Sequence, residues 1–392
     1  MRRISLFLTV LLTTLVSGAV PSDSLIVSLL TCRAGSDIYQ LEGHSGLRIR
    51  YPQSGSDMTV NWGVFDFNSP NFVYRFVKGE TDYLCAAYPT EHFLAEYRRE
   101  GRTVVEQVLN LSPEEAEKLL QLASVNLMPS NRVYRYNYVY DNCATRPLAL
   151  IEQAIGDTVA LAAPSGDKVG PTFRSVMTSF HKNYPWYQFG IDTALGAGID
   201  IPIDNRHLAF APELLEEMMA GAVRPDGTPA VSETNVLLKG KPEGVILPPT
   251  PWWLTPMFWS IIITVICIGI SVRQLRTSRL TTATRIADTL FFGVAGIEGL
   301  ILTFLIFVSV HEATSPNWLY LWLNPLCLLG TVGVWIKNIK RLVIYYQIVN
   351  FALLIAMTVI FVSGVQKPNP AFVPLLVADA TLALPWFTSL RK

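Results

Sequence analysis

Two patterns meet at a cysteine in the stretch RYNYVYDNCATRP, residues 135–147. Its tyrosines alternate with smaller residues, which is the period of a half-buried strand. From residue 144 to residue 155 the apolar spacing is helical, with Pro147 in the first turn. Cys143 is therefore predicted at a helix N-terminus, where unpaired amides and the helix dipole favour a thiolate. We interpret Cys143 as a nucleophile.

A thiol nucleophile needs a proton partner, and His44 is the best-placed histidine for this role. It lies in a predicted strand, residues 38–51, that a turn at 54–57 joins to a second predicted strand, residues 59–67. The imidazole in turn needs a group that orients it. Asn61 and Asp66, both on the second strand, are the two candidates.

Disulfide pairing is the structural alternative for Cys143, because an exported protein can oxidise Cys32, Cys85 and Cys143 in pairs. Three such cysteines leave one unpaired, and the helix-start position favours Cys143 as the free thiol. The sequence has no CxxC, no HExxH and no close pair of histidines. A phosphate-binding loop is absent too, so we expect neither a metal nor a cofactor.

The composition indicates a membrane protein, since 50% of the residues are hydrophobic and only 16% are charged. A formal net charge of zero gives no basic field for nucleic acid. Residues 1–20 resemble a signal peptide, with Arg2 and Arg3 before a short apolar run; an uncleaved anchor is the alternative. We expect a globular domain over residues 21–251 and a transmembrane domain over residues 252–392.

Apolar segments in the C-terminal part predict an all-α bundle of five transmembrane helices. Their approximate ranges are 254–272, 286–310, 318–336, 342–364 and 372–390. The alternate loops are rich in arginine and lysine, whereas those on the globular side hold only Lys367. The positive-inside rule then puts the globular domain in the periplasm and the C-terminus in the cytoplasm.

Two polar residues of the transmembrane part are candidates for a role in function. Glu298 lies among glycines in a predicted span, where a carboxylate must face a partner or water. It serves either a lipid-access cleft or a hydrogen bond between helices. His311 lies in a short outer loop, close to where the globular domain would rest.

Five segments together resemble the Lnb N-terminal periplasmic domain family, over roughly residues 24–201. They are SLLTCRAGSDIYQLEGHSGLRI (28–49), NWGVFDFNSPNFVYRFVKGETDYL (61–84), EQVLNLS (106–112), YNYVYDNCATR (136–146) and PWYQFGIDTALG (185–196). The DNCATR segment is the most specific. Glu42 departs from the bulky residue expected before the Gly-His pair, which affects the local pocket but not the catalytic assignment.

The resemblance implies an α+β periplasmic domain with a permuted papain-like (NlpC-like) thiol fold. It also implies a lipoprotein N-acyltransferase of Gram-negative cytoplasmic (inner) membranes. Cys143 would take an acyl group from a phospholipid as a thioester, with His44 moving the proton. The acceptor would be the N-terminal amine of a diacylglyceryl-cysteine lipoprotein.

Such substrates need an apolar surface and a phosphate contact near the thiol. The candidate binding residues are Arg48, Tyr138, Tyr140, Asn142, Arg146, Trp186 and Tyr187.

Two other functions fit the same residues. A membrane-tethered cysteine hydrolase acting on peptidoglycan or another amide needs the same cysteine and histidine, although one membrane anchor would suffice for it. A non-enzymatic envelope sensor or assembly factor would carry Cys143 as a structural thiol only.

Overall fold

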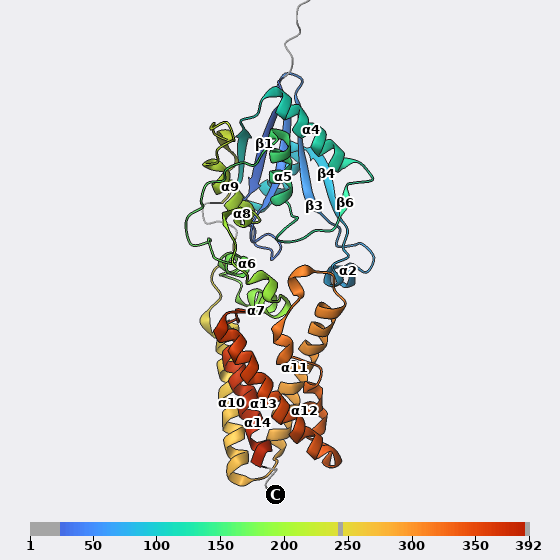
Figure 1. The fold of residues 1–392 in the computed structure, drawn as a ribbon, viewed down its shortest axis with the longest axis vertical. Helices are drawn as coiled ribbons and strands as arrows, with labels where there is room; N and C mark the ends of the chain where they lie inside the picture. Colours follow the sequence, from blue (N-terminus) through green and yellow to red (C-terminus); the bar gives the residue numbers. More distant parts are fainter. Residues whose placement is uncertain (1–23, 242–245, 389–392) are drawn as a thin grey trace, which may run out of the picture.

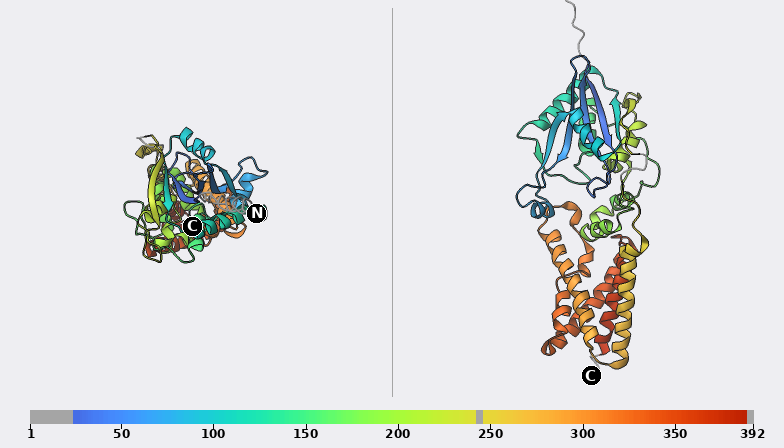
Figure 2. Two further views of the ribbon diagram at one scale, coloured as in Figure 1. Left: turned by 90° about the horizontal axis from the view of Figure 1, so that it is seen from above. Right: turned by 180° about the vertical axis from the view of Figure 1, so that it is seen from behind.

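The computed structural model describes residues 24–241 and 246–388, so the signal peptide expected at residues 1–20 lies outside the described part. A β-sheet domain stands at one end of a bundle of long helices, as Figure 1 and the reverse view in Figure 2 show. The chain passes into the bundle at the one-turn helix η2 (Trp252–Leu254).

The described strands form one antiparallel sheet in the order β6-β4-β3-β2-β1-β5-β7. They are β1 (Ile26–Cys32), β2 (His44–Tyr51), β3 (Ser56–Val64), β4 (Tyr83–Pro89), β5 (Val104–Leu109), β6 (Val133–Tyr134) and β7 (Val231–Leu238). The predicted hairpin is confirmed as β2 and β3, whose register pairs Gly46 with Asn61. Leu47 and Trp62 of this hairpin are fully buried in the main core.

Helices cover the sheet and extend the domain towards the bundle (Figure 1). They are α2 (Phe72–Lys78), α3 (Thr90–Glu100), α4 (Pro113–Leu127), α5 (Thr145–Ile155), α6 (Phe173–Phe180), α7 (Pro185–Ala194), η1 (Ala197–Ile199), α8 (Asn205–Leu208) and α9 (Pro212–Ala220). Ser112 caps α4 in a reciprocal capping box with Glu115, and Pro113 is the first residue of the helix.

The helices of the bundle are α10 (Pro256–Thr277), α11 (Thr282–Phe307), α12 (Cys327–Gly333), α13 (Lys340–Ser363) and α14 (Phe372–Thr388), with one-turn helices η3 (Glu312–Thr314), η4 (Trp318–Leu321) and η5 (Lys337–Ile339) between them. Within residues 24–241 and 246–388, three helical segments are long and apolar enough to cross a membrane: Pro256–Thr277, Thr282–Phe307 and Lys337–Ser363. Helix α14 is shorter, with 17 residues.

The segment 318–336, for which the sequence predicts a third span, is not a continuous helix. Pro325 has no amide to donate, and the Asn324 side chain bonds the neighbouring backbone at Leu321 and Leu326. The segment still packs along α11, because a Cβ on Gly299 would lie 2.3 Å from the Asn324 backbone. Hydropathy therefore identified the apolar stretch but not its interruption.

The outer loops of the bundle pack directly on α7 and on the residues after it. The Asn317 side chain donates to the Thr193 carbonyl at 2.9 Å, and the Gly196 amide donates to the Ala313 carbonyl at 2.8 Å. A Cβ on Gly196 would lie 2.2 Å from the Pro316 oxygen, so this close approach requires glycine. The two parts of the protein thus share a tightly packed boundary.

Candidate active site

Cys143 lies immediately before α5, at the N-terminal end that the sequence predicts, and is 5% exposed. The tyrosine-rich run before it differs from the prediction, because β6 ends at Tyr134. Residues 137–141 instead form a turn closed by two backbone hydrogen bonds between Asn137 and Asp141. The Asn137 side chain accepts two amides inside this turn, which favours a turn over a strand.

The Asn142 side chain holds the turn that presents Cys143. Its oxygen accepts the amides of Ala144 and Thr145 at 2.8 and 2.9 Å, which caps the start of α5. Its nitrogen donates to the carbonyls of Tyr138 and Phe210 at 2.7 and 2.8 Å. With these four contacts Asn142 faces the protein backbone, so its geometry is that of a positioning residue and not of a substrate ligand.

His44 opens β2 and joins the thiol to a third residue. Its Nε2 lies 2.6 Å from the Asn61 Oδ1 on β3, and its ring also hydrogen-bonds the Cys143 thiol. Asp66 lies elsewhere, in an exposed turn after β3, where its carboxylate accepts the Asn68 amide. Of the two candidate orienting residues, the structure therefore brings only Asn61 to the histidine.

Two further groups bond the thiol. The Tyr136 hydroxyl donates to the sulfur at 3.6 Å and accepts the Cys143 amide, and the Ser45 amide donates to the sulfur. Burial raises the pKa of Tyr136, and the neighbouring thiolate raises it further, so the hydroxyl keeps its proton and acts as a donor. The sulfur thus forms hydrogen bonds with the His44 ring, the Tyr136 hydroxyl and the Ser45 amide.

These contacts decide the charge state of the Cys–His pair. Burial by itself raises the pKa of the Cys143 thiol, but the His44 charge and the hydrogen bonds outweigh it, so the pKa lies below its usual value. Burial likewise lowers the pKa of His44, but the thiolate and the hydrogen bonds to Cys143 and Asn61 raise it above its usual value. The geometry favours a thiolate–imidazolium pair.

The other cysteines of the sheet domain have the opposite character. Cys32 and Cys85 are free and buried. The structure therefore contains no disulfide among Cys32, Cys85 and Cys143, which was the alternative to a free thiol at Cys143. Burial raises the pKa of each thiol to about 12, despite nearby arginines. Both are therefore protonated near neutral pH and poor nucleophiles, unlike Cys143.

The arginines considered for phosphate recognition are engaged in the protein itself. Arg48 forms ion pairs with Asp57 and Glu106. Arg146 forms a bidentate pair with Asp141. Arg48 is thus held by two carboxylates, whereas Arg146 is held by one carboxylate and lies over the Tyr134 ring, and both have fewer donors left for a substrate phosphate.

The aromatic candidates lie around the site in separate places. Tyr138 hydrogen-bonds Glu42 and packs on Phe210, whereas the Tyr140 ring packs on Phe173 and His207. On α7, Trp186 donates to the Leu254 carbonyl at 2.6 Å and Tyr187 packs on His181. The structure therefore does not gather these four side chains at the thiol.

The turn before Cys143 touches the outer loop of the bundle. The Asn137 side chain donates to Glu312 of η3 at 3.0 Å. A small cavity of about 170 Å³ lies between this turn, η1 and η3.

His311, which precedes Glu312 in the chain, hydrogen-bonds the Phe76 carbonyl at 2.8 Å and so connects α2 to the bundle. Glu298 is half-buried on α11, one residue before the close contact at Gly299.

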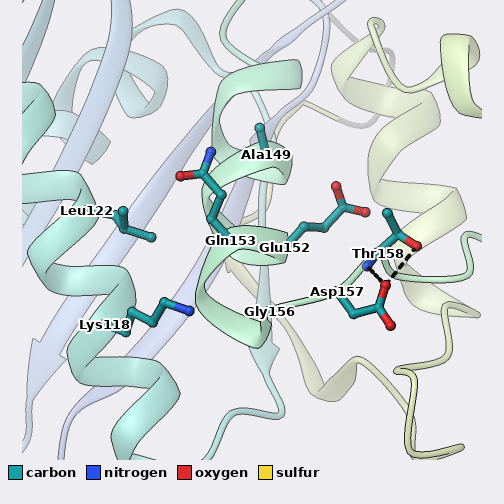
Figure 3. A pocket seen from close by; sticks show the side chains of 8 residues that line it. All are labelled: Lys118, Leu122, Ala149, Glu152, Gln153, Gly156, Asp157 and Thr158. Atoms are coloured by element: carbon teal, nitrogen blue, oxygen red, sulfur yellow. Dashed lines mark hydrogen bonds between the residues drawn. The ribbon is translucent and has the colours of Figure 1, made fainter.

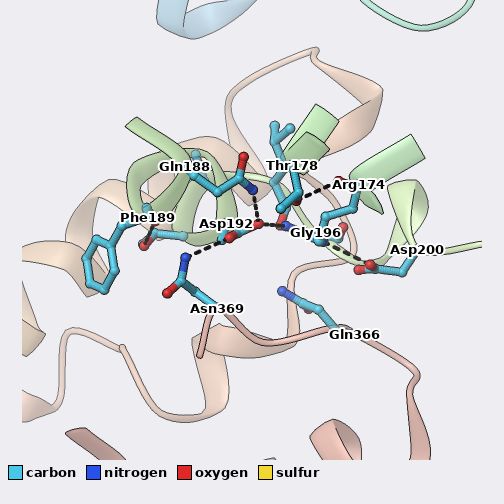
Figure 4. A network of polar contacts seen from close by, with 12 residues as sticks. Arg174, Thr178, Gln188, Phe189, Asp192, Gly196, Asp200, Gln366 and Asn369 are labelled. Atoms are coloured by element: carbon cyan, nitrogen blue, oxygen red, sulfur yellow. Dashed lines mark hydrogen bonds and ion pairs between the residues drawn. The ribbon is translucent and has the colours of Figure 1, made fainter. Parts of the chain in front are cut away.

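A buried chain of polar side chains runs from the residues before His44 into the bundle. The His181 ring bonds Glu42 and Gln188, each at 2.7 Å. Gln188 donates to Asp192 at 2.8 Å, and Asp192 also accepts Asn369 at 2.9 Å (Figure 4). Arg174 adds ion pairs to Asp192 and Asp200, both 2.8 Å long. The active-site domain and the α13–α14 loop thus share one hydrogen-bonded network.

A second pocket, of about 630 Å³, is an open hollow between α4 and the C-terminal end of α5 (Figure 3). It lies at the opposite end of α5 from Cys143 and belongs to a different surface. Within the described ranges, no group of three histidine, cysteine or acidic side chains is arranged to hold a metal ion.

Comparison with protein families matches both parts of the chain. The model of the Lnb N-terminal periplasmic domain matches residues 14–178. The model of the Lnb transmembrane domain matches residues 249–384. The chain belongs to the Lnb family. This Lnb-family chain is accordingly a multi-pass membrane protein with a periplasmic domain. No curated protein and no solved structure gives a significant match.

Several site groups of this Lnb-family chain were not identified from the sequence. Tyr136 is not among the candidates that the sequence indicates, although its position seven residues before Cys143 is visible in the sequence. The Ser45 amide, next to His44, carries no sequence signal, because every residue but proline has an amide. Glu42 and His181 are separated by 139 residues, so their contact depends on the fold.

Proposed function

We propose that this protein is a thiol-dependent lipoprotein N-acyltransferase. It moves a fatty acyl group from a phospholipid, through a thioester on Cys143, to the N-terminal amine of a diacylglyceryl-cysteine lipoprotein. The observation that carries the proposal is a hydrogen-bonded Cys143–His44–Asn61 triad with a buried thiol, whose turn contacts the outer loop of a membrane bundle. Such a thiolate is poised for acyl chemistry beside lipid.

In the first step the Cys143 thiolate attacks the ester carbonyl of the phospholipid. The C–S bond forms as the carbonyl becomes an oxyanion, and the Tyr136 hydroxyl, which donates to the sulfur before the attack, is the donor that stabilises it. The ester C–O bond then breaks, and the imidazolium of His44 gives its proton to the leaving lysophospholipid alkoxide. The products are a Cys143 thioester and neutral His44.

In the second step the lipoprotein amine attacks the thioester carbonyl. Neutral His44 accepts the proton from the amine as the C–N bond forms, and the C–S bond breaks to release the thiolate. Asn61 accepts from the His44 Nε2 throughout and so keeps the other ring nitrogen towards the sulfur. The cycle ends with the thiolate–imidazolium pair restored and one amide bond made.

The proposal includes the membrane location and the orientation of the protein. The enzyme sits in the cytoplasmic (inner) membrane with its sheet domain in the periplasm, and the chain crosses the bilayer five times, with the segment 318–336 as an interrupted third crossing. Arginine and lysine in the loops away from the sheet domain support this orientation. A cysteine two residues before a helix that packs on an antiparallel sheet supports the permuted papain-like fold.

The decisive experiment compares lipoprotein N-terminal peptides by mass in cells with the wild-type protein, the Cys143→Ser variant, or none. We expect the N-linked acyl chain to be lost in both deficient strains, and an acyl mass to be found on Cys143 of the purified wild-type protein incubated with phospholipid. Unchanged lipopeptides with altered muropeptides would instead indicate the cysteine hydrolase. A Cys143→Ser strain identical to wild type in both would leave a non-enzymatic role.

A further inference from the structure

A row of aromatic rings connects the thiol to the outer end of α11. Tyr136, which bonds the Cys143 sulfur, stacks on Tyr83 with ring centroids 4.8 Å apart. Tyr83 contacts Phe65 at 5.4 Å, and Phe65 stacks on Phe72 of α2 at 5.9 Å. The row is thus continuous from the sulfur to helix α2.

Helix α2 carries the row to the bundle. Phe72 stacks on Phe76 at 5.8 Å, and Phe76 contacts His311, which follows α11. The Val310 amide donates to the Lys78 carbonyl at 2.8 Å, and the Ser309 hydroxyl to the Val77 carbonyl at 2.9 Å. Helix α2 is therefore fastened where a membrane span ends, at the level of the bilayer surface.

The outer face of α2 is apolar and uncovered by protein. None of its residues is buried, and the side chains of Val73, Tyr74 and Phe76 are 73%, 54% and 47% exposed. Tyr74 also contacts Phe304 on the side of α11, so this face continues into the lipid-facing surface of the bundle. Exposed apolar side chains continuous with a membrane surface are covered by lipid.

The charges beside the row indicate which part of a lipid it suits. Arg75 and Arg135 are both paired with Asp82, and Lys78 is paired with Glu80. Each of these three cations is engaged by a carboxylate, although the two carboxylates leave one positive charge over, and the row itself consists of aromatic rings without a charged side chain. That surface fits a hydrocarbon chain better than a phosphate headgroup.

We propose that this aromatic row is the site of the donor acyl chain, along which one chain of a phospholipid leaves the bilayer beside α11 and reaches Cys143. The inference rests on the acyl transfer proposed above and names the path of its donor. It assigns the function of admitting lipid to α2, a helix with no fully buried residue.

The test uses the purified full-length protein in nanodiscs and measures acylation of Cys143 by mass, without any acceptor. The donors are a dipalmitoyl phospholipid and the short ester p-nitrophenyl butyrate, which has too short a chain to follow the row. Phe76→Ser and Phe72→Ser are the variants, and Val236→Ser on edge strand β7, also exposed, is the matched control. We expect each phenylalanine variant to lower the long-chain to short-chain rate ratio about tenfold, and the control to leave it unchanged.

Each other outcome is decisive. Ratios unchanged in both phenylalanine variants, or equal losses with both donors, would overturn the row while leaving acyl transfer intact. Unchanged acylation of Cys143, with slower transfer when a diacylated lipoprotein is added afterwards, would also overturn it, since the row would then hold the acceptor's chains. Failure of the wild-type protein to acylate Cys143 with either donor would instead refute the proposed function itself.

Discussion

Burial and polar neighbours act on the Cys143 thiol in opposite directions. Burial favours the neutral thiol, whereas His44, the Tyr136 hydroxyl and the Ser45 amide favour the thiolate and together lower its pKa. The raised pKa of His44 keeps the imidazole protonated beside it. The pair is ionised at pH values above the pKa of Cys143 and below that of His44, which is the state that the first step requires.

Removing the His44 charge reverses this balance. In His44→Ala, the effect of burial on the Cys143 thiol is no longer offset by the charge and hydrogen bond of His44. The pKa of the thiol therefore rises, and the thiolate forms only at more alkaline pH. An unperturbed thiol is a few per cent ionised at pH 7, so we expect alkylation of Cys143 by iodoacetamide at pH 7 to slow at least about tenfold. The pH profile of alkylation, followed by mass, measures the shift.

The matched control for this experiment is His92→Ala, because His92 is an exposed histidine on α3. Its pH profile should superimpose on that of the wild-type protein. A His44→Ala profile that does the same would show that the imidazole does not set the pKa of the thiol.

At the scale of single elements, the sequence predicts helices better than the segment before the thiol. The capping box of α4 and the apolar spacing of α5 are local signals, and α5 forms within one residue of its predicted bounds. Tyrosine and valine have strand propensity, but in residues 136–140 the side chains of Asn137 and Asn142 bond the backbone and impose a turn. The position of the nucleophile was predictable, whereas the route of the chain into it was not.

Asn142 ties the structure of this turn to the reactivity of the thiol. Asn142→Ala removes four buried hydrogen bonds, so we expect a loss of about 2 kcal/mol or more in the free energy of unfolding. Cys143 then loses its fixed place at the start of α5, and alkylation at pH 7 slows. The apparent unfolding temperature and the alkylation rate are the two measurements.

Ser112→Ala is the matched control, because it removes a helix cap at α4, away from the thiol. It should lower the free energy of unfolding by about 1 kcal/mol, and with it the unfolding temperature, yet leave the alkylation rate of Cys143 unchanged. If both variants slowed alkylation in proportion to their loss of stability, Asn142 would support the fold alone.

At the scale of the whole molecule, composition and charge predict the division into a periplasmic domain and a membrane bundle, but not how the two meet. Asp192 and Asn369 are 177 residues apart, and no sequence pattern in either segment predicts their contact. The same holds for the triad, since the His44–Asn61 bond depends on the diagonal register of β2 and β3. Local rules identify candidate residues, and long-range packing selects among them.

The Asp192–Asn369 bond should couple the bundle to the active-site domain. In Asn369→Ala one oxygen of the buried Asp192 carboxylate loses its hydrogen-bond donor, which costs about 1–3 kcal/mol. The contact between α7 and the α13–α14 loop is then weaker. We expect faster amide hydrogen exchange in α7 and in residues 364–371 of the protein in nanodiscs, with β1 to β3 unchanged. Ser363→Ala, an exposed position beside the same loop, is the control and should change neither. If exchange in α7 stayed the same in both variants, the two parts would be held together by apolar packing and the other outer-loop contacts, and the polar chain from Glu42 to Asn369 would not transmit strain between them.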